Sequence, residues 1–236
     1  MRYRMRFGTR ATLAGLALVL MALPFALLLL LVGARWDPLV DLDLGASDGL
    51  HGVALEDGAF VTTLKVISTI GSARIYLPLF TALAIWLAAR GPRRVAAFVV
   101  VTVGASPILN SLAKRAVDRS RPVFPEPVAH AGGSSFPSGH AQNATVAAGV
   151  LLIVFLPALR GRRRTAALLA ALVWVFLVCF SRVGLGVHFV SDVVAGVIVG
   201  AAWVSAMTAV FDPWRRETTT RAGTGTASSA RGSPAR

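Results

Sequence analysis

Long runs of apolar residues, separated by short charged turns, dominate the hydropathy pattern of this chain. A helix that crosses a bilayer needs about 20 mostly apolar residues. Uncharged runs of about this length occupy residues 11–33, 95–113, 141–159, 165–181 and 193–211. A sixth run is shorter, and we place it at residues 72–89, with Arg74 reaching toward the membrane interface. The pattern therefore predicts an all-α polytopic membrane protein with six transmembrane helices.

Two segments of this plan allow more than one interpretation. The run at residues 11–33 follows four arginines, as in a secretory signal peptide, but it is longer than the usual apolar core of about 7–15 residues. Its length favours an uncleaved anchor helix. Helical spacing of apolar residues also precedes the second span, at Phe60, Leu64, Ile67 and Ile70. Both an interfacial amphipathic helix and the frayed start of that span fit this spacing.

Basic residues are distributed unevenly over the segments that connect the spans. The chain has 24 Lys+Arg and 11 Asp+Glu, a net charge of +13. Sixteen of the 24 lie in the two terminal tails and in the turns at residues 90–94 and 160–164. Six spans place these four segments on one side, which the positive-inside rule identifies as cytoplasmic. Both termini are then cytoplasmic, and the acidic segment 34–71 is an outer loop.

The composition excludes classes of protein that a basic chain could otherwise suggest. Hydrophobic residues make up 55% of the chain and charged residues 15%, with a mean hydropathy of +0.67. Soluble domains carry about 25% charged residues, and disordered chains have low hydrophobicity. Nucleic-acid binders are basic but polar, so we expect no nucleic-acid partner. The excess of arginine suits a cell-membrane bilayer with anionic lipids instead.

We divide the chain into three parts. Residues 1–10 form a basic cytoplasmic tail, and residues 11–214 form the six-span domain. Residues 215–236 are rich in Gly, Ser, Thr and Arg without apolar periodicity, which is typical of a disordered cytoplasmic tail. The residues that suggest chemistry lie between positions 114 and 192.

Several basic and imidazole side chains lie on the outer side, against the positive-inside rule. We interpret Arg115 and Arg119 as anchors for lipid headgroups, and Asp118 as a counter-charge to them. His51 and His130 have no patterned neighbours, so we interpret them as ordinary loop residues. The remaining outer cations and histidines fall into spaced motifs.

Two histidines have neighbours that suit phosphoryl chemistry. His188 and Asp192 are four residues apart, so on a helix they share one face. A carboxylate bonded to one imidazole nitrogen leaves the other nitrogen free to attack. His140 opens a predicted helix, where it could donate a proton to a leaving oxygen.

The same end of the predicted bundle carries groups that suit an anion. Ser138 and Gly139 precede a helix, whose first N–H groups are free to bind a phosphate. Lys114, Arg121 and Arg182 would neutralise phosphoryl oxygens. We refer to these five residues as the phosphate clamp.

The residues form three motifs: Lys-x6-Arg-Pro at 114–122, Pro-Ser-Gly-His at 137–140 and Ser-Arg-x5-His-x3-Asp at 181–192. They match every position of the motifs of the type 2 phosphatidic acid phosphatase (lipid phosphate phosphatase) superfamily, and the six-span plan resembles its bacterial membrane branch. Outside residues 114–192 the resemblance is only architectural. It places the active site at the extracytoplasmic ends of helices 3–6.

The resemblance implies a metal-independent phosphatase without a cofactor. Its substrate would be a lipid phosphate or lipid diphosphate, of the phosphatidic acid, phosphatidylglycerol phosphate or undecaprenyl diphosphate type. His188 would form a phosphohistidine intermediate with Asp192 orienting it, and His140 would act as acid and then base. The phosphate clamp would bind the phosphoryl oxygens.

Two other functions are compatible with the same motifs. A vanadium haloperoxidase-like enzyme shares the anion-binding residues, but six spans and the lack of a large soluble scaffold argue against it. A non-catalytic lipid transporter on this fold would not require the intact set of His140, His188 and Asp192. The choice of lipid, of mono- or diphosphate, and the oligomeric state stay open.

Overall fold

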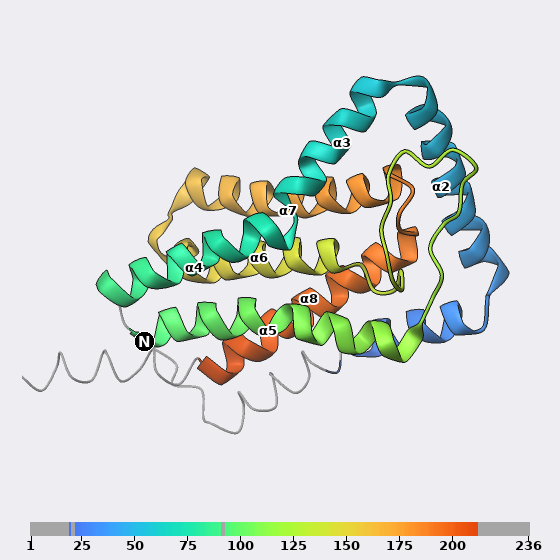
Figure 1. Cartoon of the computed structure of the whole chain (residues 1–236). Coiled ribbons are helices and arrows are strands. Elements are labelled where there is room, and N and C mark those ends of the chain that lie inside the picture. Colours follow the sequence, from blue (N-terminus) through green and yellow to red (C-terminus); the bar gives the residue numbers. More distant parts are fainter. Residues whose placement is uncertain (1–18, 20–21, 91–92, 212–236) are drawn as a thin grey trace, which may run out of the picture.

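The computed structural model describes residues 19, 22–90 and 93–211, and every regular element in these ranges is a helix. A first helix runs over Ala22–Gly33. The others, labelled in Figure 1, are α2 (Asp37–Glu56), α3 (Gly58–Ile70), α4 (Ala73–Arg90), α5 (Arg93–Val117), α6 (Gly139–Phe155), the short 3₁₀ turn η1 (Leu156–Ala158), α7 (Gly161–Gly184) and α8 (Val190–Phe211).

Five helical segments of the described chain are long and apolar enough to cross a membrane. They are Gly58–Arg90, Arg93–Val117, Gly139–Ala158, Gly161–Gly184 and Val190–Phe211. A sixth is counted if Ala22–Gly33 and α2, which meet at an angle of 86°, form one broken span. The prediction of an all-helical, multi-span membrane protein is confirmed. Residues 11–18, 20 and 21 of the first predicted span lie outside the described residues, as do both predicted tails.

The segment predicted as the outer loop, residues 34–71, folds into the two helices α2 and α3. Asp57 separates them, and its carboxylate caps α3 by accepting bonds from the N–H groups of Ala59 and Phe60 at 2.8 and 3.0 Å. Val61 and Leu64 are buried, whereas Val66 and Ile70 are exposed, so α3 packs against the bundle with one face and carries apolar side chains on the other as well. A break at Gly71-Ser72 separates α3 from α4, and α4 agrees with the predicted second span.

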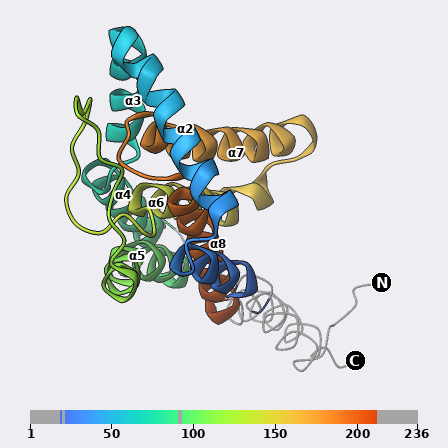
Figure 2. The ribbon, with the colours of Figure 1, turned by 90° about the vertical axis from the view of Figure 1, so that its right-hand side faces the viewer.

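Helix α6 lies at the centre of the bundle, with α5, α7 and α8 packed around it (Figure 2). Two glycines of α8 allow a close approach. A Cβ atom at Gly196 would lie 2.4 Å from the carbonyl oxygen of Ser138, and one at Gly200 would lie 2.9 Å from that of Gln142. Small residues at such spacing let transmembrane helices pack backbone to backbone. The start of α6 is therefore pressed directly against α8.

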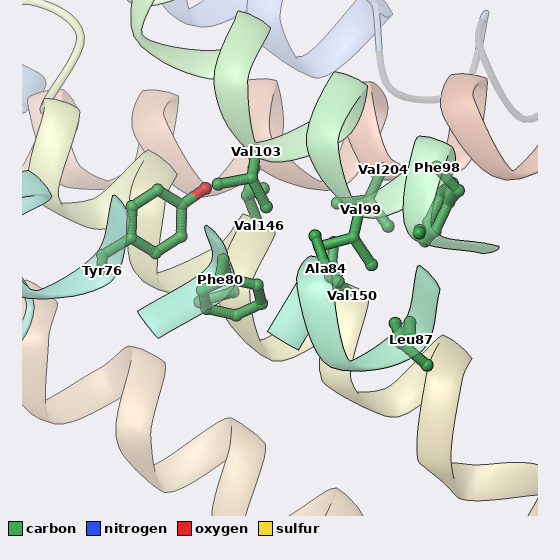
Figure 3. Packing of buried hydrophobic residues seen from close by; sticks show 12 residues of the cluster. Tyr76, Phe80, Ala84, Leu87, Phe98, Val99, Val103, Val146, Val150 and Val204 are labelled. Atoms are coloured by element: carbon green, nitrogen blue, oxygen red, sulfur yellow. The ribbon is translucent and has the colours of Figure 1, made fainter. Parts of the chain in front are cut away.

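One end of the bundle has an apolar core. Figure 3 shows its members from α4, α5, α6 and α8 interlocking at close range. The labelled side chains are Tyr76, Phe80, Ala84, Leu87, Phe98, Val99, Val103, Val146, Val150 and Val204. Each is less than 9% exposed, so this core is tightly packed and would be costly to disturb.

Polar side chains replace the apolar ones toward the start of α6. Gln142 is fully buried, and its amide donates to the carbonyl and hydroxyl oxygens of Ser106 at 2.8 and 2.9 Å. Asn110 donates to Gln142 Oε1 at 2.9 Å and to the Pro137 carbonyl at 3.4 Å. These bonds fix the first turn of α6 against α5, because buried amides are costly to leave unpaired.

Candidate active site

The three motifs meet at one end of the bundle. Lys114 lies in the last turn of α5, His140 in the first turn of α6, Arg182 in the last turn of α7, and His188 just before α8. In Figure 1 these four helix ends gather on the right-hand side, together with the segment that joins α5 to α6. Because successive helices of the bundle run in opposite directions, Lys114 and His188 lie at the same end although they are 74 positions apart in the chain.

Two cations of the phosphate clamp are held by one backbone oxygen. The ammonium group of Lys114 donates to the carbonyl of Ser134 at 2.5 Å, and Arg121 Nη2 donates to the same oxygen at 3.2 Å. Arg121 also donates to the carbonyls of Gly132 and Gly133, each at 3.0 Å. The joining segment thus positions both side chains with its peptide groups.

His188 lies between a cation and a carboxylate. Its Nε2 atom is 3.1 Å from Arg121 Nη1, and its Nδ1 atom is 3.4 Å from Asp192 Oδ2. The same carboxylate oxygen accepts a bond from the N–H of Phe189 at 2.9 Å. The predicted pair of His188 and Asp192 therefore forms, with Nε2 facing the clamp.

Burial lowers the pKa of His188 to about 4 from its usual value near 6.5. The hydrogen bond and the charge of Asp192 oppose this shift, whereas Arg182 and Arg121 add to it. An imidazole with this pKa is neutral at pH 7 and keeps a lone pair available on one nitrogen. Partial burial of Arg121 lowers the pKa of its guanidinium as well, and the charge of Asp192 opposes that shift.

The first turn of α6 supplies the backbone part of the clamp. Ser138 is fully buried at the helix N-cap, and its N–H donates to the carbonyl of Asp192 at 2.9 Å. Gly139 approaches α5 closely, because a Cβ atom there would lie 3.1 Å from Asn110 Oδ1. Motifs two and three are thus joined directly through their backbones.

Two buried side-chain atoms of the phosphate clamp have no hydrogen-bond partner within the described residues. They are Ser138 Oγ and Arg182 Nε. Arg182 is 8% exposed, and its Nη1 atom donates to the hydroxyl of Ser68 on α3. Unsatisfied buried donors are costly, so both atoms are suited to a polar ligand such as a phosphoryl oxygen.

His140 shares this site. It is half-buried, and it lies close enough to Arg182, Lys114 and Arg121 to interact electrostatically with their charges. His188 acts on it in the same way. All eight residues that the sequence predicts for the site therefore lie at the same end of the bundle.

The turn between α7 and α8 returns the chain to the site through Gly186. Its φ angle is +65°, a conformation that favours glycine. A Cβ atom there would also lie 2.8 Å from the ring of Phe124. Leu185 and Val187, on either side, are buried against Ala54 and Leu64, which anchors the turn.

The interpretation of Arg119 as a lipid anchor is wrong. Its guanidinium donates to Asp192 Oδ1 at 2.8 Å and to Asp43 Oδ2 at 2.9 Å, so it joins α8 to α2. Sequence reasoning missed Asp43 as a site residue. A signal existed, since Asp43, Ser47 and His51 are spaced by four and lie on one buried face of α2.

The predictions for the other outer residues agree with the structure to different degrees. His51 is not a loop residue, because it lies in α2, is buried, and stacks on Phe124 with ring centroids 3.9 Å apart. His130 lies in the irregular segment and is exposed, as predicted, and Arg115 and Asp118 are exposed as well.

A cavity of about 280 Å³ opens beside Arg121. Its walls come from the segment after motif one and from the turn before His188. They include Arg121, Phe124, His130, Leu185 and Val187. The cavity is therefore adjacent to the Arg121 side of the clamp.

Comparison with known proteins identifies relatives of this region. The model of the PAP2 superfamily matches residues 95–216. Phosphatidylglycerophosphatase B of Bacillus subtilis is 38% identical over 105 residues, which are 43% of this chain and 51% of the relative. Lipid A 1-phosphatase of Rhizobium etli is 34% identical over 125 residues, 49% of this chain and 50% of the relative. The match thus spans about half the length of these curated relatives.

Solved structures share the fold over a longer stretch. The crystal structure of a transmembrane PAP2-type phosphatidylglycerolphosphate phosphatase from Bacillus subtilis superposes with a TM-score of 0.72 and 26% identity, covering 84% of this chain and 98% of that one. The crystal structure of Aquifex aeolicus LpxE superposes with a TM-score of 0.55 over 72% of this chain and 94% of that one. Because its identity to this chain is 19%, the Aquifex aeolicus structure supports a similarity of fold alone.

Proposed function

The chain belongs to the PAP2 superfamily, and from this premise we propose that it is a metal-independent phosphatase of membrane lipid phosphates. The observation that carries the proposal is the setting of His188, whose Nε2 atom faces Arg121 at 3.1 Å and whose Nδ1 atom faces Asp192 at 3.4 Å. A neutral, oriented imidazole beside fixed cations is the arrangement that phosphoryl transfer through a histidine requires.

The first half of the reaction forms a phosphohistidine. Nε2 of His188 attacks phosphorus, and the N–P bond forms as the bond between phosphorus and the leaving oxygen breaks. His140 gives a proton to that oxygen. Lys114, Arg121 and Arg182 neutralise the phosphoryl oxygens, and the N–H groups at the start of α6 add hydrogen bonds.

The second half releases phosphate. His140 takes a proton from a water molecule, and the water oxygen attacks phosphorus. The N–P bond breaks, and His188 regains its lone pair. Asp192 accepts a hydrogen bond from the Nδ1–H group of His188 throughout and stabilises the positive charge that develops on the ring. Because arginine and lysine meet the phosphoryl charge, this scheme needs no metal ion.

The substrate class follows from the site's setting at helix ends in an apolar bundle. A lipid can keep its chains in the bilayer while its phosphate enters between α5, α6, α7 and α8. The named relatives are phosphatases of phosphatidylglycerophosphate and of lipid A. We include phosphatidic acid, phosphatidylglycerol phosphate and undecaprenyl diphosphate as candidate substrates. We also propose that the bilayer around the protein contains anionic lipids.

We also propose that the site faces the extracytoplasmic side and that both termini are cytoplasmic. The support is the charge pattern: the arginine-rich turns before α5 and before α7 lie at the bundle end opposite the motifs. Two variants, Glu126→Cys and Arg162→Cys, each in a Cys179→Ala background, would test this orientation in intact cells. An impermeant maleimide should label the first and spare the second, and the reverse pattern would contradict the proposal.

The activity is tested by phosphate release in detergent from a panel of these lipids, with His188→Ala as the blank. We expect activity that survives excess chelator and is blocked by vanadate, together with an acid-labile phosphoprotein trapped from labelled substrate. Loss of activity in chelator would identify a metal enzyme. Halide oxidation with added vanadate would favour a haloperoxidase, and lipid binding without release would favour a transporter.

A further inference from the structure

We propose that Asp43, on helix α2, is a positioning residue that holds the catalytic pair in place through Arg119 and Ser191. This inference rests on the proposed function, because it assigns a task within the same reaction. Asp43 belongs to none of the three motifs, and it precedes them by more than 70 positions. Its role follows from what its side chain binds.

The carboxylate of Asp43 is almost completely buried, at 1% exposure, and it accepts three bonds. One comes from the backbone N–H of Ser191 at 2.9 Å and one from the Ser191 hydroxyl at 2.5 Å. The third comes from Arg119 Nη2 at 2.9 Å. Asp43 therefore caps the first turn of α8 from another helix, where a negative charge also suits the helix dipole.

Arg119 connects this carboxylate to that of Asp192. While Nη2 binds Asp43, Nη1 donates to Asp192 Oδ1 at 2.8 Å and to the hydroxyl of Ser191 at 2.6 Å. The guanidinium also lies over the ring of Phe189, 4.4 Å from its centroid. A planar guanidinium holds two carboxylates at a fixed separation, which an ammonium group cannot do.

The network ends on the proposed nucleophile. Asp192 uses Oδ1 for Arg119 and Oδ2 for His188, so the position of one oxygen determines that of the other. Both carboxylates are buried, and Arg119 supplies the positive charge that bonds to each of them. Removing the charge of Asp43 would leave Arg119 free to turn toward Asp192 and rotate its carboxylate away from the histidine.

The packing of α2 supports a role at this end of the bundle. Ala46 and Leu50, one turn apart on α2, pack against Ala141, Val183 and Val193, which belong to the helices that carry the motifs. The same buried face of α2 holds Ser47 and His51. Helix α2 is thus fixed to the site by both apolar contacts and a buried ion-pair network.

The test compares Asp43→Asn with Asp41→Asn, an exposed acid on the same helix. We expect Asp43→Asn to lower kcat by about 10–100-fold, the effect typical of residues that orient a reacting side chain. KM and the inhibition constant of inorganic phosphate should stay within about twofold, because the clamp is unchanged. Vanadate, which must bond to an oriented His188, should inhibit more weakly. Asp41→Asn should match the wild type.

Arg119→Lys keeps the test decisive if Asp43→Asn folds poorly, and a double variant tests the coupling if it folds. Arg119→Lys retains the charge but loses the planar fork, and we expect it to lower kcat in the same way. A double variant, Asp43→Asn with Arg119→Lys, should lose no more than the more damaging single change, because both act through Asp192.

Wild-type kcat in Asp43→Asn, or additive losses in the double variant, would overturn the positioning role. So would a parallel rise in KM and in the phosphate inhibition constant, which a merely structural role produces. The proposed function fails separately, when the wild type releases no phosphate or when His188→Ala retains activity. Activity that depends on His188 but not on Asp43 would reject this inference alone.

Discussion

The two ends of the helix bundle use the same helices for different purposes. At one end α5, α6 and α8 bury apolar side chains such as Phe98, Val150 and Val204. At the other end the same helices, with α2 and α7, bury charged and polar groups that include Asp192, Arg182 and Gln142. Apolar burial adds stability, whereas a buried charge is costly unless it is paired. Stability and chemistry should therefore respond to different mutations.

The largest effect should come from the two histidines. We expect His188→Ala to lower kcat by about 10⁴-fold or more, because no nucleophile replaces the imidazole. His140→Ala should cost about 10²–10⁴-fold and leave a trace of activity on substrates with good leaving groups, such as an aryl phosphate. Phosphate release measures both. Equal residual activity in the two variants would contradict the assigned roles.

A substitution between α6 and α8 should disturb the site through the backbone. In Gly196→Ala the new Cβ would lie 2.4 Å from the carbonyl oxygen of Ser138, so the first turn of α6 must move. We expect a loss of about 10²-fold in kcat/KM, as for small misplacements of reacting groups. Gly104→Ala on α5, where a Cβ meets nothing within 4 Å, is the control. Comparable activity in both variants would show that this contact is adaptable.

The pH dependence should reflect the burial of His188. Burial lowers its pKa to about 4, so the imidazole remains neutral as the pH falls from 6.5 toward 4 and becomes protonated below that. The neutral fraction, and with it kcat/KM, should then fall by about tenfold per pH unit. Titration of the imidazole signals by NMR, with the His188 signal assigned by its absence in His188→Ala, would separate protonation of His188 from ionisation of the substrate. A midpoint near 6.5 for His188 would contradict the effect of burial.

The smallest effect on activity should come from the apolar end. Phe80 is 3% exposed, so Phe80→Ala should destabilise the fold by about 3–5 kcal/mol while leaving kcat within about twofold. Thermal unfolding in detergent and phosphate release measure the two quantities. The neighbouring Leu79, 61% exposed, provides the control Leu79→Ala with little change in either. A large loss of kcat in Phe80→Ala at temperatures where the variant is folded would show that the two ends are coupled.

The local patterns of the sequence predicted the spans and the eight proposed site residues. Hydropathy determines which segments can cross a bilayer, and α4, α5 and α8 lie close to the predicted ranges. The motif residues were recognisable because Lys114 and Arg121, or His188 and Asp192, stand at short fixed spacings. The family match supports that recognition.

The contacts between distant segments could not be predicted in the same way. Nothing near Asp43 or Arg119 in the sequence specifies that their side chains meet, because the contact depends on how α2 leaves the preceding helix at an angle of 86°. The stacking of His51 on Phe124 has the same origin. Periodicity reveals the buried face of α2, but only the tertiary fold reveals what that face meets.

The use of peptide carbonyls to hold Lys114 and Arg121 has an evolutionary consequence. The oxygens of Gly132, Gly133 and Ser134 belong to the main chain, so residue replacement in this segment leaves the bonds available, except at Gly133, whose φ of +70° favours glycine. Mutations could therefore alter the walls of the adjacent cavity, and with them the preferred headgroup, without dismantling the cationic site. A deletion that shortens the segment would remove that tolerance. Substrate choice in such a protein can drift by substitution while its chemistry is inherited intact.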